Sequence, residues 1–322
     1  MLKRIRVHQL QVGMFVEEVE GGGRQQPPPR FSPFLISSPA EIERMMHSSL
    51  MTVVINVGKG LDVGRDALSP NSCGRAQFDT QLLSTFSAQD IKQAKQCIED
   101  TKPHIRHVLS EARINGAFAT NAASAAVERI MSAALDNAGA VIATAKLKEK
   151  DEVTFLHSLA VSALMIAFGR NLGHSEEDVR LLGVGGLVHD LGKMALPNAI
   201  LMKTGKLSDE EMDLVRAHPQ RSYDLISRIE STPKQVLDIC RYHHEKFDGS
   251  GYPHRLAGKQ IPYVARLAAV CDVYEALTTV RPYKRAWSQA EAINMMMNSP
   301  GHFDDTLLKA FISRMVINGT LH

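Results

Sequence analysis

The sequence of 322 residues contains little cysteine, and its cysteines lack the spacing of a structural zinc site. The four residues, Cys73, Cys97, Cys240 and Cys271, include no C-x-x-C pair. This arrangement disfavours both a zinc knuckle and a disulfide framework. A reducing, cytoplasmic location is therefore expected.

The chain also lacks a large excess of charge and a long apolar run. Its 37 Lys and Arg residues against 35 Asp and Glu residues give a formal net charge of +2. No basic surface for a nucleic-acid polymer is therefore expected. No apolar core of a signal peptide follows residues 1–6. The longest apolar stretches, such as LAVSALMIAFG at residues 159–169, are expected to be too short to span a bilayer, and no membrane contact is predicted.

Patterning divides the chain into three parts, and its length suffices for two domains. Residues 1–62 are predicted to form a small β-containing domain, because residues 13–20 (GMFVEEVE) and 51–58 (MTVVINVG) are rich in β-branched and apolar residues. Residues 63–145 are predicted to be a linker and connecting helices. Residues 146–322 show helical periodicity without strand alternation. The predicted fold class is mainly α, with an all-α domain preceded by a small β-containing domain.

Histidine is abundant, and nine of the 13 histidines lie at or beyond His157, which places the expected chemistry in the C-terminal part. A lone histidine on an apolar face, such as His157, is usually a hydrogen-bonded core residue. Asp190 and Asp272 are harder to explain in that way. Each lies in an apolar segment, where an unpaired carboxylate is costly or is neutralised. A divalent cation would offset that cost.

Five histidines join the two aspartates in a candidate metal-binding set. The set is His157, His189, Asp190, His218, His243, His244 and Asp272. Imidazole and carboxylate ligands suit iron, manganese, nickel or zinc. Seven ligands are too many for one tetrahedral ion and suit a pair, and two metals ~3.5–4 Å apart are usual for hydrolysis of phosphate esters. Because adjacent helical residues project ~100° apart, His189 and Asp190 can reach different metals, or Asp190 can bridge both.

Several motifs in this part of the chain resemble those of a known family. HDLGK at residues 189–193 resembles the signature of the HD superfamily of metal-dependent phosphohydrolases. HHEKFDGSGYP at 243–253 resembles the extended signature of its HD-GYP branch, and DVYEALTTVRPYK at 272–284 resembles the segment that follows it. RIRVHQLQVGMFV at 4–16, with IERMMHSSLMTVVINVGKG at 42–60, resembles the small uncharacterised domain that often precedes HD-GYP domains. The resemblance implies an all-α, HD-type phosphohydrolase domain over residues 146–322.

The resemblance implies a phosphodiesterase that opens cyclic di-GMP to linear pGpG in bacterial second-messenger signalling, with further hydrolysis to GMP left open. It implies that the seven residues above bind two divalent metal ions, with Asp190 bridging them. Iron or manganese is the expected metal, with nickel and zinc as alternatives. It implies catalytic roles for Lys193, Asp190 and Asp248. It further implies substrate contacts from Lys193, Tyr252, Arg281 and Lys284.

Details of the implied site follow from single positions. Asp248 either caps the Gly-rich turn or assists proton transfer. Glu245 is interpreted as an acceptor that orients a histidine. Some members of the family carry a glutamate for a third metal four residues before the first histidine; Val153 stands there and cannot ligate, so two metals are favoured.

Two other functions stay open at this point. The domain can be a catalytically weak sensor or docking module whose Gly-Tyr-Pro surface contacts a GGDEF diguanylate cyclase, or an HD hydrolase for another nucleotide. A homodimer is a further open prediction. The intact ligand set favours the enzyme, since a docking module has no need of buried aspartates.

Overall fold

The computed structural model describes residues 2–6, 10, 12–21, 32–38, 41–42, 45, 50–60, 85–146, 153–201, 203, 205–279, 287–317 and 320–321. The chain divides into two compact units, Met1–Ala76 and Gln77–His322. The domain boundaries predicted from the sequence at 62 and 145 stay predictions. Residues 61–84, where the first boundary falls, lie outside the described residues.

The first unit contains a four-stranded antiparallel sheet. Its strands are β1 (Leu2–Arg6), β2 (Phe15–Gly21), β3 (Phe34–Leu35) and β4 (Leu50–Asn56), in the order β1-β4-β2-β3. Val53 and Ile55 alternate along β4 onto the buried face, opposite Val19 and Val16 of β2. The predicted β-containing character of this part is confirmed. Residues 22–31 of the Gly/Pro-rich insert lie outside the described residues.

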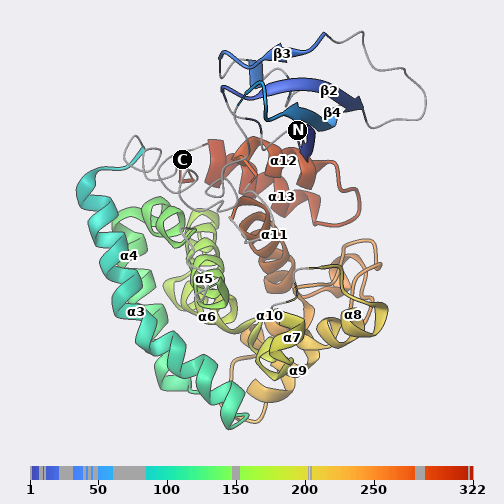
Figure 1. The fold of residues 1–322 in the computed structure, drawn as a ribbon. Helices are drawn as coiled ribbons and strands as arrows, with labels where there is room; N and C mark the ends of the chain where they lie inside the picture. The colour runs from blue at the N-terminus through green and yellow to red at the C-terminus, as the bar shows by residue number, and fades with distance from the viewer. Residues whose placement is uncertain are drawn as a thin grey trace. The chain divides into compact units, whose positions relative to one another are not determined.

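The second unit is helical (Figure 1). Its elements are α3 (Ala88–Ile114), α4 (Thr120–Ala145), α5 (Val153–Leu172), α6 (Glu176–Val188), η3 (Leu191–Ala195), α7 (Asn198–Leu201), α8 (Asp209–Arg216), α9 (His218–Ile226), α10 (Lys234–Tyr242), η4 (Gly258–Gln260), α11 (Tyr263–Thr278), α12 (Gln289–Met297), α13 (Asp305–Phe311) and η5 (Ile312–Ile317). Within the described part of this unit there is no strand, which confirms the predicted mainly α fold class.

Helix α5 forms the centre of the helical core. It packs against α4, α6 and α11 (Figure 1), and Leu159, Leu164 and Phe168 are fully buried. Residues Thr154–Leu172 have a mean hydropathy of 1.3, so by length and composition alone this helix could cross a membrane. The expectation that no apolar stretch is long enough is therefore wrong for α5. Because 83% of the segment is buried inside the protein, its apolar surface is accounted for by the core.

Close backbone packing brings the HDLGK segment against α9. A Cβ atom on Gly192 would lie 2.2 Å from the carbonyl oxygen of His218, a distance that no side chain tolerates. The Ser222 hydroxyl links the two segments by two hydrogen bonds: it accepts from Gly192 N and donates to His189 O, both at 2.8 Å. The glycine of the motif therefore lets the start of α9 approach Asp190.

Candidate metal centre

The structure gathers all seven predicted metal ligands inside the helical unit. By element they are His157 on α5, His189 and Asp190 after α6, His218 at the start of α9, His243 and His244 after α10, and Asp272 on α11. They form two groups, in each of which the ligand atoms lie within 4.8 Å of one another: Asp190 with His218, His243 and His244, and His157 with His189 and Asp272. All except the half-buried His244 are buried.

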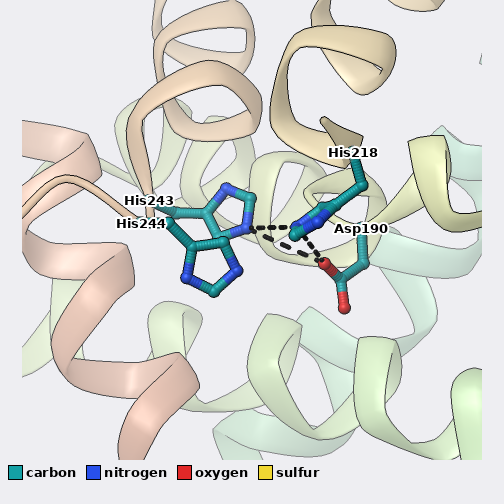
Figure 2. A group of neighbouring side chains, drawn as sticks. All are labelled: Asp190, His218, His243 and His244. Atoms are coloured by element: carbon teal, nitrogen blue, oxygen red, sulfur yellow. Dashed lines mark hydrogen bonds and ion pairs between the residues drawn. The ribbon is translucent and has the colours of Figure 1, made fainter. Parts of the chain in front are cut away.

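In the first group, His218 and His243, from two different segments, converge on one carboxylate oxygen of Asp190 (Figure 2). Asp190 Oδ1 lies 3.1 Å from His218 Nε2 and 3.7 Å from His243 Nε2. The two Nε2 atoms are 3.3 Å apart. His244 lies beside them, with its ring centroid 4.2 Å from that of His243.

In the second group, the other oxygen of Asp190 takes part. Asp190 Oδ2 lies 3.4 Å from His157 Nε2 and 3.5 Å from His189 Nε2. Asp272 Oδ1 approaches the same two nitrogens, at 3.3 and 3.8 Å. Asp190 therefore stands between the groups and turns one oxygen to each.

In three of the histidines, hydrogen bonding through Nδ1 leaves the unprotonated Nε2 facing the other candidate ligands. Nδ1 faces a backbone carbonyl in His189 (Gly186 O, 2.8 Å), His218 (Val215 O, 2.7 Å) and His243 (Ile239 O, 3.0 Å). A carbonyl oxygen only accepts, so Nδ1 carries the proton and Nε2 of the neutral ring presents a lone pair. The buried atoms His189 Nε2 and Asp190 Oδ1 have no hydrogen-bond partner. Converging lone pairs and an orphaned carboxylate oxygen are what a bound cation would satisfy.

The electrostatic environment sets the protonation states that metal ligands need. Burial lowers the pKa of His189 to about 4, and it also lowers the pKa values of His218 and His244. Burial opposes the charge of Asp190 and Asp272, but the pKa of each is held well below its usual range by nearby positive groups: Lys193 and imidazoles for Asp190, imidazoles for Asp272. Three imidazoles are thus neutral and both carboxylates are ionised at neutral pH.

His157 has the opposite tendency. Burial disfavours its charge, but the charge of Glu275, together with Asp190 and Asp272, raises the pKa of His157 to about 10. Its Nδ1 lies 2.6 Å from Glu275 Oε2. Glu275 is fully buried and was not among the residues that the sequence singled out. The signal available for it was its position three residues after Asp272, on the same side of α11.

Lys193 contacts one of the candidate metal ligands, Asp190. Its Nζ is 2.5 Å from Asp190 Oδ2, and its side chain is 28% exposed. The ammonium group is therefore held at the carboxylate oxygen that faces His157 and His189.

The segment at residues 243–257 forms one wall beside the histidines. Tyr252 stacks on His244, with ring centroids 4.9 Å apart and an interplanar angle of 26°. A Cβ atom on Gly251 would lie 2.3 Å from Lys246 N, so this position requires glycine. The predicted role of Tyr252 in lining the substrate groove stays a prediction.

Glu245 and Asp248 form hydrogen bonds with backbone nitrogens rather than with the rings of the candidate histidine ligands. The buried Glu245 carboxylate accepts from the backbone nitrogens of His254 (2.7 Å) and Leu256 (3.1 Å), so the interpretation that it orients a histidine is wrong. Asp248 is exposed and accepts from Ser250 N at 2.8 Å, the contact of a turn cap. Its catalytic role stays a prediction. Arg281 and Lys284 lie outside the described residues.

Comparison with known families gives two matches along the chain. Residues 123–307 match the HD domain family, and residues 2–123 match a family described as a domain of unknown function. The chain belongs to the HD domain family. Binding of divalent metal by the helical unit follows from this membership and from the two His/Asp groups.

Individual relatives agree with this membership. The HD domain chain is 39% identical over 322 residues to the cyclic di-GMP phosphodiesterase PA4108 of Pseudomonas aeruginosa, covering 98% of this chain and 77% of that one. It is 41% identical over 152 residues to the cyclic di-GMP phosphodiesterase response regulator RpfG of Xanthomonas campestris, which covers 47% of this chain and 40% of the relative. It is 36% identical to the 3'3'-cGAMP-specific phosphodiesterase 1 of Vibrio cholerae over 188 residues, 58% of this chain and 42% of that one.

A solved structure shares the fold. The HDG"Y"P protein Bd1817 of Bdellovibrio bacteriovorus aligns with a TM-score of 0.58 over 97% of this chain and 99% of its own, at 18% identity. The HD-GYP resemblance, the fold class and the expectation of a metal-dependent phosphodiesterase are confirmed by these findings together.

Proposed function

We propose that this HD domain protein is a binuclear-metal phosphodiesterase that hydrolyses cyclic di-GMP to linear pGpG in bacterial second-messenger signalling. The observation that carries the proposal is the place of Asp190, whose two oxygens face two separate sets of imidazole Nε2 atoms. A carboxylate so placed is suited to bridge two cations. The name of the relative that matches 98% of this chain supports the substrate.

The donor set favours two ions of iron or manganese, with nickel or zinc as alternatives. Among the described residues neither group of ligand atoms contains a cysteine, and burial raises the pKa of the Cys271 thiol well above its usual value. When bound, two divalent ions would acidify a water molecule and neutralise the charge that develops on the phosphoryl oxygens. His157, His189 and Asp272 would hold one ion, His218, His243 and His244 the other, with Asp190 shared.

Residues around the metals would bind and orient the substrate. Lys193 stands at Asp190 Oδ2, where its charge would meet a phosphate as the ester bond breaks. Tyr252, held against His244, would line the groove for the nucleotide. Arg281 and Lys284 are proposed to contact phosphate on the basis of the RPYK motif. Asp248 is proposed to cap the turn beside the site, with proton transfer as its alternative role.

A second cyclic dinucleotide is a specific alternative substrate. Three relatives that are 34–36% identical over parts of the chain are named as 3'3'-cGAMP-specific phosphodiesterases. The difference between the two substrates is one purine base. The metal centre would act on both in the same way, so the base contacts decide between them.

We also propose partners and a compartment. Contact of the Gly-Tyr-Pro surface with a GGDEF protein, a homodimer and a cytoplasmic location all remain predictions. We likewise propose that the chain has three functional parts, residues 1–62, 63–145 and 146–322, and that the first part is the input domain.

The function is tested by incubating anaerobically purified protein, loaded with Fe²⁺ or Mn²⁺, with cyclic di-GMP and with 3'3'-cGAMP. Chromatography of the products is expected to give pGpG from cyclic di-GMP, and prolonged incubation decides whether GMP follows. Preferential turnover of 3'3'-cGAMP would transfer the assignment to that substrate. No turnover of either by metal-loaded protein would favour the docking module.

A further inference from the structure

His157 is anchored differently from three other histidines of the metal centre. His189, His218 and His243 each direct Nδ1 to a neutral backbone carbonyl. His157 instead directs Nδ1 to a carboxylate, Glu275 Oε2, at 2.6 Å. This is the shortest of the four Nδ1 contacts, and it joins residues 118 positions apart on two different helices.

Glu275 is itself held in place from its other oxygen. The hydroxyl of Thr279, the residue that follows α11, donates to Glu275 Oε1 at 2.7 Å. Glu275 and Thr279 are both buried. A buried carboxylate is costly unless it is charge-paired or well hydrogen-bonded, so its retention inside an apolar helix requires a reason.

The metal centre provides this reason. With Nδ1 fixed by Glu275, Nε2 of His157 faces Asp190 Oδ2 at 3.4 Å and Asp272 Oδ1 at 3.3 Å. Asp272 lies one turn before Glu275 on α11, so the same helix supplies a candidate ligand and the group that orients its neighbouring imidazole.

We propose that Glu275 is a positioning residue of the metal centre, whose negative carboxylate orients His157 and makes its Nε2 a stronger metal donor. The inference rests on the proposed metal centre. A carboxylate polarises an imidazole more than a neutral carbonyl does, and loss of such a partner typically weakens metal binding by about 10–100-fold.

Charge and shape can be separated at this position by two substitutions. Glu275→Gln keeps the size, and its amide oxygen can still accept from His157 Nδ1, but the negative charge is lost. Glu275→Asp keeps the charge and shortens the side chain by one methylene. If the charge acts on His157, Asp preserves metal affinity better than Gln. If Glu275 only fills space, Gln preserves it better than Asp.

The experiment is a titration of metal-depleted, full-length protein with Mn²⁺ by calorimetry, with thermal unfolding by circular dichroism on the same samples. We expect Glu275→Gln to raise the Mn²⁺ dissociation constant of one site by about 10–100-fold, and Glu275→Asp to raise it less. Asp304→Asn is the matched control, since it also converts a buried acid to its amide but breaks an ion pair with Arg266 outside both histidine groups. It is expected to leave the Mn²⁺ affinity unchanged.

The outcomes separate this inference from the proposed function. Wild-type affinity in folded Glu275→Gln, or better binding by Gln than by Asp, overturns the positioning role. His157→Ala is measured alongside. If this variant also binds Mn²⁺ normally, the assignment of the metal centre is wrong. Should Glu275→Gln fail to fold, Thr279→Val replaces it, because it releases Oε1 and keeps the charge. Weaker Mn²⁺ binding then supports the inference, and unchanged binding overturns it.

Discussion

The ammonium group of Lys193 lies 2.5 Å from Oδ2 of Asp190, the carboxylate that stands between the two histidine groups. Burial opposes ionisation of Asp190, and the charge of Lys193 is the largest influence that lowers the pKa of Asp190 well below its usual value. The pair keeps a buried carboxylate charged before any metal binds. It also places a cation where a phosphate would sit beside the metals.

Replacing Lys193 by methionine should separate metal binding from turnover. A protonated lysine cannot ligate a metal, so Lys193→Met is expected to retain bound metal and lose about 10²–10³-fold in kcat, the typical effect of removing one group that stabilises transition-state charge. Metal content by mass spectrometry and steady-state hydrolysis of cyclic di-GMP measure the two effects. Loss of metal from a folded Lys193→Met protein would show that the lysine acts through Asp190 alone.

Asp190→Asn should abolish the centre and leave the fold intact. An amide keeps the size of the side chain, but its nitrogen presents donors to the histidines on one side and removes the bridging charge. We expect metal affinity to fall by more than about 100-fold, since an outer hydrogen-bond partner alone is worth about 10–100-fold. Helicity by circular dichroism is the control. Normal metal content in the variant would contradict the assignment of the ligands.

Metal affinity should increase with pH because of His157. Its pKa is raised to about 10 in the metal-free protein, so the ring is protonated at neutral pH and must release a proton to bind metal. His189, with a pKa of about 4, is already neutral there. The sign is therefore positive: apparent Mn²⁺ affinity should rise by up to about tenfold per pH unit between about pH 7 and 9. Calorimetry in buffers of different ionisation enthalpy should detect about one proton released, and zero release at pH 7.5 would contradict the charged state of His157.

Tyr252 should support substrate binding through its ring rather than its hydroxyl. Its ring stacks on His244, so Tyr252→Phe is expected to retain KM within about twofold, whereas Tyr252→Ala removes the stack, commonly worth about 0.5–1.5 kcal/mol, and raises KM by roughly 2–10-fold. Initial rates over a range of cyclic di-GMP concentrations test this. A defect of equal size in both variants would assign the effect to the hydroxyl.

The sequence was informative wherever a polar residue interrupts an apolar segment. Asp190 and Asp272 could be identified because burial of a carboxylate needs a counter-charge, and the histidines because they recur in motifs of known type. Glu275 was missed because its spacing of three from Asp272 was not used, and that spacing alone does not identify a partner 118 residues away. Glu245 was misinterpreted because the donors to its carboxylate are the backbone nitrogens of His254 and Leu256. The loop conformation places these nitrogens, and a pattern of side chains does not predict it.

The helical class was predictable from periodicity, but the burial of α5 in the protein core was not. Its apolar residues cover the whole circumference, so the sequence does not distinguish a central core helix from a membrane span. Packing by α4, α6 and α11 decides this.

The number of metals depends on position 153. Val153 opens α5, one turn before His157, and its side chain offers no ligand atom. We expect two metals in the natural protein and a third, weaker site in Val153→Glu. Anomalous diffraction from crystals of both proteins counts the ions. Three well-occupied peaks without the substitution would contradict this reasoning.

Hydrolysis by two bound metals is tested by one paired measurement on anaerobically purified protein: metal content per chain together with cyclic di-GMP hydrolysis, before and after chelation and reloading. We expect close to two Fe or Mn ions per chain, pGpG as product, and loss and recovery of turnover in step with the metals. A single ion per chain, or hydrolysis that survives complete removal of metal, would contradict a binuclear-metal phosphodiesterase.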